Sequence, residues 1–390
     1  MSSLLPRGSV SPPAGAPDYP LKLEPVFVER VWGREDLSFL YSSRPAEPRC
    51  VGEVWLTGGQ NRITNGPWAG FTLEEAARQH PPALLGSAVA RSRPAHGPAF
   101  PLLVKFLFTT DQLSVQVHPS DAYAQEHERS AGKTEMWHVL RAEPGARLAI
   151  GFRNDLAEGP RWERSELRKA VESGAIEEML DWMEVRKGDS FFVPAGTVHA
   201  IGPGLVLCEI QQNSDITYRF YDYNRLGTDG RPRPLHIEQA LDVLEWRTSG
   251  GRTTPLESID ALTGAPSPGW VTRLCLAACS HFATEWLSLG SPYHHQGRGK
   301  VEIWIALEGE ARFEAGRETV VCRRGEVVVL PAAVSPVLIQ PTSPAVFLRT
   351  FPPDLDADVL APLRAQGYSE ERLARVCFPS QPVVRSLNHL

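Results

Sequence analysis

The sequence predicts a mainly β protein made of two jelly-roll barrels, with a small helical insertion in the first barrel. Many short segments rich in β-branched and aromatic residues are bounded by Gly, Pro or Asp, as strands joined by turns are. The chain of 390 residues contains 34 Pro and 32 Gly, which also fits frequent turns. In addition, one sequence pattern of the N-terminal half returns in the C-terminal half. Short antiparallel strands repeated in this way are typical of jelly rolls.

The expected strands fall into two groups, one in each half of the chain. In the N-terminal half they cover residues 51–57, 101–108, 112–118, 135–140, 146–152, 189–195 and 205–212. In the C-terminal half they cover residues 301–307, 311–315, 326–332, 336–340 and 345–350. Each group has enough short strands for one barrel.

Two stretches of the N-terminal half have helical periodicity instead. Apolar residues recur at i, i+3 and i+4 in residues 71–86 and in residues 164–183, which predicts amphipathic helices. Thr72 and Ser165 precede acidic first turns and are the expected N-caps. The second helical stretch forms the expected insertion in the first barrel.

The repeated pattern indicates a duplicated domain. Residues 188–199, Gly-Asp-Ser-Phe-Phe-Val-Pro-Ala-Gly-Thr-Val-His, have a counterpart in residues 325–335, Gly-Glu-Val-Val-Val-Leu-Pro-Ala-Ala-Val-Ser. In both copies a turn with a glycine and an acidic residue leads into an apolar strand that ends at Pro-Ala. The first copy continues to His199, whereas the second offers no ligand. We therefore expect the chemistry to belong to the first copy.

Composition sets the expected domain boundaries. Residues 1–20 hold five prolines and are expected to form a flexible leader. Residues 21–247 should form a catalytic, metal-binding domain, with the helical insertion at about 153–184. Residues 248–269, rich in Pro, Gly and Thr, are the expected linker. Residues 270–390 should form a second, metal-free domain with a C-terminal tail.

Charge and cysteine content exclude several classes of protein. The net charge of −6 argues against non-specific binding to nucleic acid or to acidic membranes. No apolar stretch approaches the roughly 20 residues of a membrane helix, and the N-terminus lacks the apolar region of a secretory signal. The six cysteines are scattered and do not suggest a disulfide framework. We expect a cytoplasmic protein, either a monomer or a homodimer.

Four side chains of the first copy form a candidate metal site. Gln116 and His118 are two residues apart on an expected strand, so both side chains lie on one face of the sheet. Glu135 begins a later strand, and His199 follows the Pro-Ala-Gly turn. Oxygen and nitrogen ligands of this mixture suit a divalent ion such as zinc. Each residue alone could be an ordinary polar residue, and it is their combination that favours a shared site.

The motifs that carry these residues resemble known families. Residues 188–199 resemble the second conserved motif of cupin barrels. Leu-Ser-Val-Gln-Val-His-Pro, Gly-Lys-Thr-Glu-Met-Trp, Pro-Ala-Gly-Thr-Val-His-Ala and Gln-Gln-Asn-Ser-Asp-Ile-Thr-Tyr-Arg together resemble the type I mannose-6-phosphate isomerases (phosphomannose isomerases), in their short bacterial form. The resemblance runs from about residue 23 to about residue 224. It implies two cupin barrels and a zinc-dependent aldose–ketose isomerase that interconverts mannose 6-phosphate and fructose 6-phosphate.

The resemblance also implies roles for individual residues. One zinc per chain would be bound by Gln116, His118, Glu135 and His199. Arg219 matches the catalytic arginine of the family, and an arginine is well suited to binding oxyanions.

Further polar residues flank the expected metal ligands. Lys105, Ser114 and Lys133 would line a sugar-phosphate pocket, although Lys105 could instead reach the solvent from a strand end and Lys133 could be a solvated loop charge. Glu209 shares a strand face with Gln211 and is the first choice for a second acid or base, or else an ion-pair partner.

Asp215 lies in the turn before Arg219 and could bind substrate, orient Arg219 or cap that turn. Two other functions remain open from the sequence. Cupin barrels also host metal-dependent dioxygenases, and a non-catalytic cupin could bind a sugar phosphate without converting it.

Overall fold

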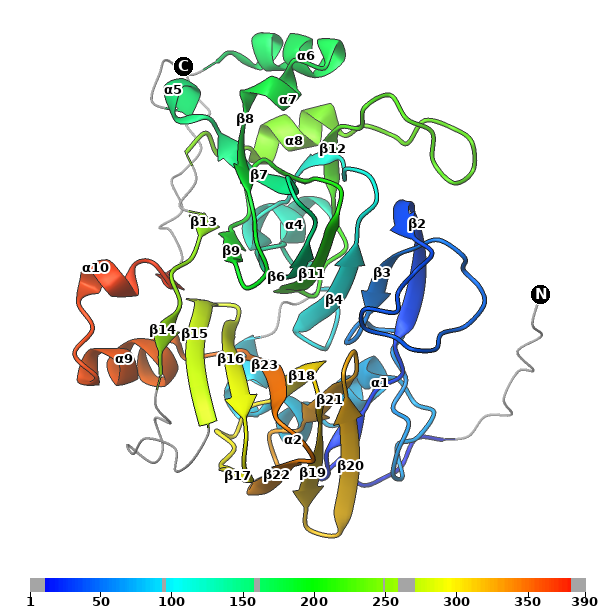
Figure 1. Ribbon diagram of the computed structural model, residues 1–390, viewed down its shortest axis with the longest axis vertical. Coiled ribbons are helices and arrows are strands. Elements are labelled where there is room, and N and C mark those ends of the chain that lie inside the picture. Colours follow the sequence, from blue (N-terminus) through cyan, green and yellow to red (C-terminus); the bar gives the residue numbers. More distant parts are fainter. Residues whose placement is uncertain (1–10, 93–95, 158–161, 248–249, 259–270, 380–390) are drawn as a thin grey trace.

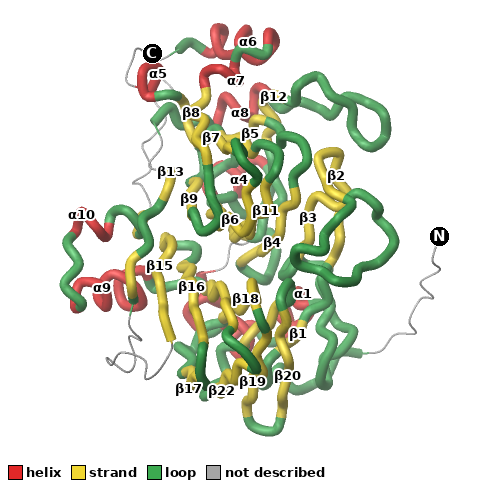
Figure 2. Tube along the Cα trace, viewed as in Figure 1, coloured by secondary structure: helices red, strands yellow, loops and turns green. Residues whose placement is uncertain are grey.

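The computed structural model describes residues 11–92, 96–157, 162–247, 250–258 and 271–379. Among these residues, strands predominate and form four sheets arranged in two units (Figure 1). The N-terminal unit lies at the top of the view and the C-terminal unit at the bottom. Figure 2 shows that the helices lie mainly at the periphery of the strands. The prediction of a mainly β protein with a few helices is confirmed.

Two antiparallel sheets make the N-terminal unit. The larger has the order β13 (Gly251–Arg252), β9 (Ser190–Val193), β6 (Glu135–Ala142), β11 (Leu205–Gln212), β4 (Leu102–Phe108), β3 (Val51–Trp55), β2 (Val26–Arg34). The smaller has the order β12 (Tyr218–Tyr221), β5 (Val115–Val117), β10 (His199–Ile201), β7 (Arg147–Phe152), β8 (Leu180–Glu184). An apolar cluster that includes Trp137, Leu148 and Leu207 joins the two sheets.

The C-terminal unit repeats this plan. Its larger sheet has the order β1 (Leu21–Lys22), β21 (Val327–Leu330), β18 (Glu302–Glu308), β23 (Ala345–Phe351), β16 (Ala283–Leu289), β15 (Val271–Cys279), β14 (Leu256–Glu257), and β24 (Cys377–Phe378) also pairs with β15. Its smaller sheet has the order β17 (Tyr293–His295), β22 (Val337–Pro341), β19 (Glu310–Ala315), β20 (Glu318–Arg323). The expected strands of both halves are therefore present, and half of them are shorter than expected.

Helices cover the ends of both units. They are α1 (Leu73–Gln79), α2 (Pro81–Leu85), α3 (Ser87–Ser92), α4 (Asp121–His127), α5 (Asn154–Ala157), α6 (Arg164–Ser173), α7 (Ile176–Met179), α8 (Ile237–Val243), the π-helical η1 (Asp356–Leu360), α9 (Ala361–Ala365) and α10 (Glu370–Leu373). Residues of α6, α7 and α8 pack with Val115, Val117 and Ala200 on the outer face of the five-stranded sheet. The opposite face of β5 is thereby left for polar side chains.

The helix predictions are only partly right. Thr72 caps α1 as expected, through a capping box with Glu75. Ser165 does not cap α6, because Glu163 occupies the N-cap and Ser165 lies inside the helix. Residues 180–184 are a strand and not the end of a helix. Gly174 ends α6 in a left-handed conformation, and β8 then pairs with β7, which overrides the helical periodicity of the sequence.

The leader and linker predictions also need correction where residues are described. Residues 1–10, 248–249 and 259–269 lie outside the described residues. Tyr19 is buried, however, and its hydroxyl accepts a hydrogen bond from the Trp68 amide. Within the expected linker, β13 extends a sheet of the N-terminal unit and β14 a sheet of the C-terminal unit. The described parts of the leader and of the linker are therefore packed against the rest of the protein. The leader places Tyr19 in the core, and the linker adds an edge strand to each of two sheets.

The two units share one large apolar core. Buried residues from both units, among them Phe106, Phe282 and Ile303, form one continuous cluster. β1 precedes the N-terminal unit in sequence but pairs with β21 of the C-terminal unit. The Ala332 amide donates a hydrogen bond to the Leu84 carbonyl, which fixes α2 against the C-terminal unit. In Figure 1, α1 and α2 accordingly lie beside strands of that unit. In the part of the chain that is described, no helix has the length and apolar character needed to cross a membrane.

Candidate active site

Three buried side chains that are distant in sequence converge inside the N-terminal unit. His118 directly follows β5, Glu135 begins β6 and His199 begins β10. The Nε2 atom of each histidine lies 3.5 Å from an oxygen of the Glu135 carboxylate. One atom of each of these three side chains could bind a metal, and these atoms all lie within 4.8 Å of one another. They are therefore close enough to share one metal ion.

Strand register brings Gln116 to the same place. Gln116 on β5 lies opposite His199 on β10 on one side and opposite Arg219 on β12 on the other. Val115 and Val117 face the helices, so Gln116 faces the interior between the two sheets. Gln116 therefore shares a sheet face with His199, one of the three residues of the cluster.

The turn before His199 requires glycine. Gly196 has a φ of +84°, and a Cβ there would lie 3.0 Å from the Val243 carbonyl oxygen. The Gly196 amide donates a hydrogen bond of 2.8 Å to the His118 carbonyl. The turn therefore links the segment carrying His118 to the start of β10, which carries His199.

Both histidines are held as neutral acceptors. The Nδ1 atom of His199 donates a hydrogen bond of 2.9 Å to the Thr197 carbonyl, which leaves the Nε2 lone pair directed at Glu135. Burial lowers the pKa of His199 to about 4. Burial, together with the Lys133 ammonium, holds the pKa of His118 well below its ordinary value. Neutral imidazoles beside a carboxylate are the donor set of a divalent metal site.

The contacts of this cluster fit a cation. His199 Nε2 is buried and has no hydrogen-bond partner among the described residues. Lys133, which is also buried, places its Nζ atom 2.9 Å from His118 Nε2 and 2.9 Å from Glu135 Oε2. The acceptor atoms of His118 and Glu135 therefore already bind one positively charged group, the Lys133 ammonium. By the chemistry of its donors, it fits a divalent metal ion.

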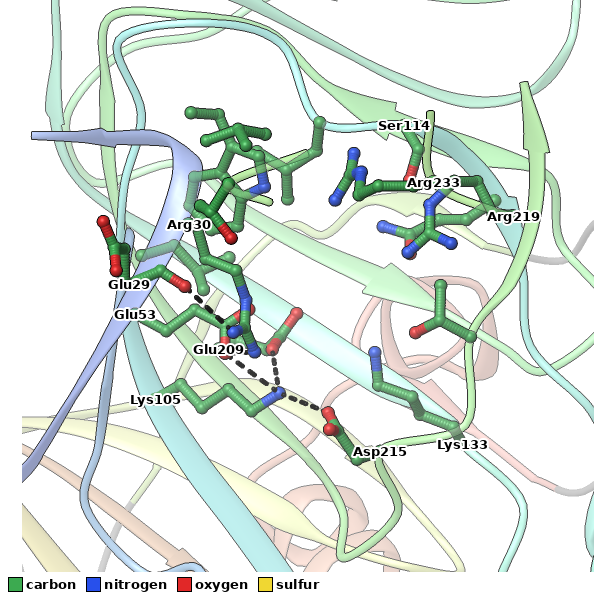
Figure 3. Close-up of a pocket in the computed structure, with 17 residues that line it drawn as sticks. Glu29, Arg30, Glu53, Lys105, Ser114, Lys133, Glu209, Asp215, Arg219 and Arg233 are labelled. Atoms are coloured by element: carbon green, nitrogen blue, oxygen red, sulfur yellow. Dashed lines mark hydrogen bonds and ion pairs between the residues drawn. The ribbon is translucent and has the colours of Figure 1, made fainter. Parts of the chain in front are cut away.

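A pocket of about 380 Å³ opens beside this cluster. Its walls carry most of the polar residues that the sequence singled out, namely Lys105, Ser114, Gln116, Lys133, Glu209, Asp215 and Arg219. Figure 3 shows Ser114, Arg219 and Arg233 on one side of the pocket and Lys105 and Asp215 on the other. The pocket is large enough for a small phosphorylated sugar.

Lys105 is enclosed by carboxylates and does not reach the solvent. Its Nζ atom lies 3.4 Å from Asp215, 3.7 Å from Glu209 and 3.9 Å from Glu53. Burial disfavours its charge, but the three carboxylates outweigh burial and raise its pKa. Asp215 therefore contacts Lys105, and no contact of its side chain with Arg219 is present among the described residues, which corrects the expectation that it orients the arginine.

Glu209 differs from the neighbouring carboxylate Glu53. Burial and then the negative charge of Glu135 raise the pKa of Glu209, while Lys133 and Lys105 oppose the shift. For Glu53, burial is outweighed by Lys105 and Arg30, which lower its pKa to about 2. Glu209 also accepts a hydrogen bond of 3.2 Å from the Trp137 indole. A carboxyl group with a raised pKa is a stronger base than an ordinary carboxylate and can accept and return a proton.

Arginines gather at the Ser114 side of the pocket. Asp222 accepts hydrogen bonds from both Arg225 and Arg233, so two guanidinium groups share one carboxylate. Arg219 donates to the Pro234 carbonyl at 2.8 Å. Burial and the nearby Arg233 charge lower the pKa of Arg219. Cations held together in this way favour an anionic ligand.

Several pocket residues have no signal in the sequence. Glu53 and Arg30 form a bidentate ion pair in the pocket wall, and Arg233 reaches the pocket from a loop. The β2 strand that carries Arg30 was not expected. Only the positive charge of Arg233, in a Pro-flanked loop, could have drawn attention to it.

Comparison with known proteins places the chain in a family. A model of the type I phosphomannose isomerase catalytic domain matches residues 21–137. The mannose-6-phosphate isomerase ManA of Bacillus subtilis is 35% identical over 319 residues, covering 80% of this chain and 93% of that protein. A mannose-6-phosphate isomerase of Streptococcus mutans is 34% identical over 321 residues, covering 81% and 93%.

The fold agrees with this match. The crystal structure of the Bacillus subtilis mannose 6-phosphate isomerase superimposes with a TM-score of 0.72 at 27% identity, covering 85% of this chain and 99% of that one. The expected cupin-type fold is thereby confirmed. On the matches in sequence and fold together, the chain belongs to the type I phosphomannose isomerase family.

Proposed function

We propose that the chain interconverts mannose 6-phosphate and fructose 6-phosphate with the help of one bound zinc ion. The observation that carries this proposal is the buried cluster of His118, Glu135 and His199 beside a pocket lined with fixed charges. The names of the two bacterial relatives support mannose 6-phosphate as the substrate and isomerisation as the reaction. An aldose–ketose isomerase needs a group that moves a proton, stabilisation for an oxyanion and a site for phosphate.

The metal would be held by Gln116, His118, Glu135 and His199. A mixed set of amide, carboxylate and imidazole ligands suits zinc, a borderline ion in its ligand preference. When bound, the ion supplies Lewis-acid stabilisation for the negative charge that develops on the sugar oxygens. Lys133 is the proposed hydrogen-bond donor to the sugar at the edge of the pocket. Its Nζ atom lies next to two of the proposed ligands, His118 and Glu135.

Glu209 is the proposed proton carrier between C1 and C2 of the sugar. Its raised pKa lets it remove a proton from one carbon and return it to the other. Lys105, 3.7 Å away, stabilises the carboxylate form and keeps it oriented toward the pocket. The contact of Lys105 with Asp215 extends this polar wall, which offers hydrogen-bond partners for sugar hydroxyl groups.

The arginine side of the pocket is the proposed phosphate site. Arg233 presents its guanidinium group near the Ser114 hydroxyl, and a guanidinium group is well suited to binding phosphate oxygens. Arg219 neighbours Gln116 in the sheet, so it can stabilise an enediolate formed next to the ligand cluster. Lys105 is paired with three carboxylates, whereas Arg233 is paired with one, Asp222, so Arg233 is the better phosphate anchor.

A coupled assay tests the proposal directly. The purified chain, stripped of metal with a chelator, is incubated with mannose 6-phosphate before and after addition of zinc, and fructose 6-phosphate is measured. We expect activity only with metal present. Oxygen consumption in the same reaction, or binding of the sugar phosphate without conversion in the zinc-loaded protein, would contradict the proposal.

A further inference from the structure

His236 lies against the outer edge of strand β12. β12 is the last strand of the five-stranded sheet, and Arg219 pairs with Gln116 only on its inner side. On the outer side, the Arg219 amide donates a hydrogen bond of 3.2 Å to His236 Nδ1. The His236 amide donates one of 2.7 Å to the Arg219 carbonyl. One residue thus satisfies both backbone groups that an edge strand leaves open.

The same short segment also holds the side chain of Arg219. Its Nη1 atom donates to the carbonyl of Pro234, two residues before His236. Backbone and guanidinium of Arg219 are therefore both fixed from residues 234–236. Residues 234–236 thus hold Arg219, a residue of the candidate active site, from outside the sheet.

The imidazole of His236 accepts a hydrogen bond from Arg219 and does not cap the helix that His236 begins. His236 is the N-cap of α8, but its side chain makes no capping hydrogen bond. Ser, Thr, Asp or Asn would cap the helix better. A side chain that leaves its helix uncapped while it binds a pocket residue indicates a role at the pocket.

We propose that His236 is a positioning residue for Arg219, which it holds with the guanidinium group facing the pocket beside Gln116. This inference rests on the proposed isomerase function. The contact needs an unprotonated Nδ1. Burial and then the Arg219 charge lower the pKa of His236, against an opposing effect of Glu128, so the ring is an acceptor at neutral pH. The neighbouring ring of Tyr218 lies 6.3 Å away, centroid to centroid.

The variant His236→Ser separates positioning from stability. A serine can cap α8 but is too short to accept from the Arg219 amide. We expect kcat to fall about tenfold, KM to change less than about twofold and the melting temperature to stay level or rise, since misplacement of a catalytic group lowers turnover. A lower melting temperature with unchanged kcat would overturn the inference. His294→Ser, at an exposed histidine of the C-terminal unit, is the matched control.

A double-mutant cycle tests whether the effect passes through Arg219. In an Arg219→Lys background, the loss caused by His236→Ser should shrink to about twofold or less, because coupled residues are not additive. A full tenfold loss in that background would contradict the inference.

An NMR measurement is independent of activity. In protein labelled with ¹⁵N-histidine, one ring in the Nε2–H form should be present in the wild type and absent from His236→Ser. Loss of a ring in the Nδ1–H form instead would refute the contact even if the chain is an active isomerase. Absence of isomerase activity in the wild type would refute the proposed function and leave the NMR result standing.

Discussion

Lys105 on β4 lies directly opposite Glu209 on β11, with their charged atoms 3.7 Å apart. The C-terminal unit has the same relationship with the charges reversed, because Glu285 on β16 lies opposite Arg349 on β23. Each pair also has a tryptophan beside it on the next strand. Trp137 on β6 lies opposite Glu209, and Trp304 on β18 lies opposite Arg349. The two units thus carry a buried ion pair at corresponding positions of their larger sheets, with the signs of the charges reversed.

Replacement of Glu209 by Gln should stop proton transfer. We expect kcat to fall by about 10²–10⁴, the range typical of a lost general acid–base group, with bound zinc unchanged. Steady-state kinetics and metal analysis of the same preparation measure the two quantities. Glu308→Gln, at an exposed carboxylate of the C-terminal unit, should behave as wild type. A Glu209→Gln variant with near-normal kcat would exclude Glu209 as the proton carrier.

Arg233→Gln should weaken phosphate binding without disturbing the chemistry. Because the guanidinium faces the Ser114 side of the pocket, we expect KM for the sugar phosphate to rise about tenfold, and inhibition by inorganic phosphate to weaken in parallel. Turnover at saturation should change little. Arg231→Gln, two residues away on the same loop and outside the pocket wall, is the matched control. Equal KM values for the two variants would remove Arg233 from the phosphate site.

Gly196→Ala should disturb the turn that carries His199. The new Cβ meets the Val243 carbonyl at 3.0 Å and occupies a residue with a φ of +84°, so we expect a loss of about 1–3 kcal/mol in unfolding free energy and weaker zinc binding. Gly188→Ala is the control, since Gly188 has a similar φ of +93° but open space around its Cβ position. If both variants bind zinc equally well, close packing at Gly196 has no effect on the site.

The inverted charge pair of the C-terminal unit predicts a pH-dependent stability. Burial opposes ionisation of Glu285, but Arg273 and Arg349 outweigh it and lower its pKa to about 2. A lowered carboxyl pKa stabilises the fold above the ordinary value near 4.5, and this contribution is lost as the pH falls toward 2.

The variant Glu285→Gln reveals this contribution. At pH 7 it should lower the unfolding free energy by about 3 kcal/mol, because it leaves buried arginine charge without a partner. The difference from wild type should shrink as the pH falls below about 4.5, because Glu285 of the unfolded wild-type chain takes up a proton there, whereas the folded chain does so only near pH 2. Urea unfolding of both proteins between pH 3 and pH 7 measures the effect. A difference that does not vary with pH would contradict the assigned pKa.

The sequence predicted the parts of the structure that local patterns determine. Gln116 and His118 share a strand face, and the Gly188–His199 string has its own turn, so their grouping could be expected before the fold was known. Strand pairing at long range was harder to predict. Residues 180–184 have helical periodicity, yet they form a strand that pairs with β7, because tertiary pairing outweighs the local pattern.

Several residues of the pocket wall could not be predicted from local sequence patterns either. Glu53, Arg30 and Arg233 enter it through sheet register and through a loop, and nothing in their local sequence indicates a site. Asp215 is close to Arg219 in sequence, but its carboxylate contacts Lys105 of β4. Contacts of this kind depend on the three-dimensional arrangement of several elements, which no single motif encodes.

We expect Gln116, His118, Glu135 and His199 together to hold one divalent ion that the reaction requires. Metal analysis by mass spectrometry, on wild type and His199→Ala after equilibration with zinc and removal of the excess, tests it most directly. We predict about one zinc per wild-type chain, almost none in the variant, and isomerisation of mannose 6-phosphate in proportion to bound metal. Full zinc content in His199→Ala, or full activity in metal-free wild type, would contradict it.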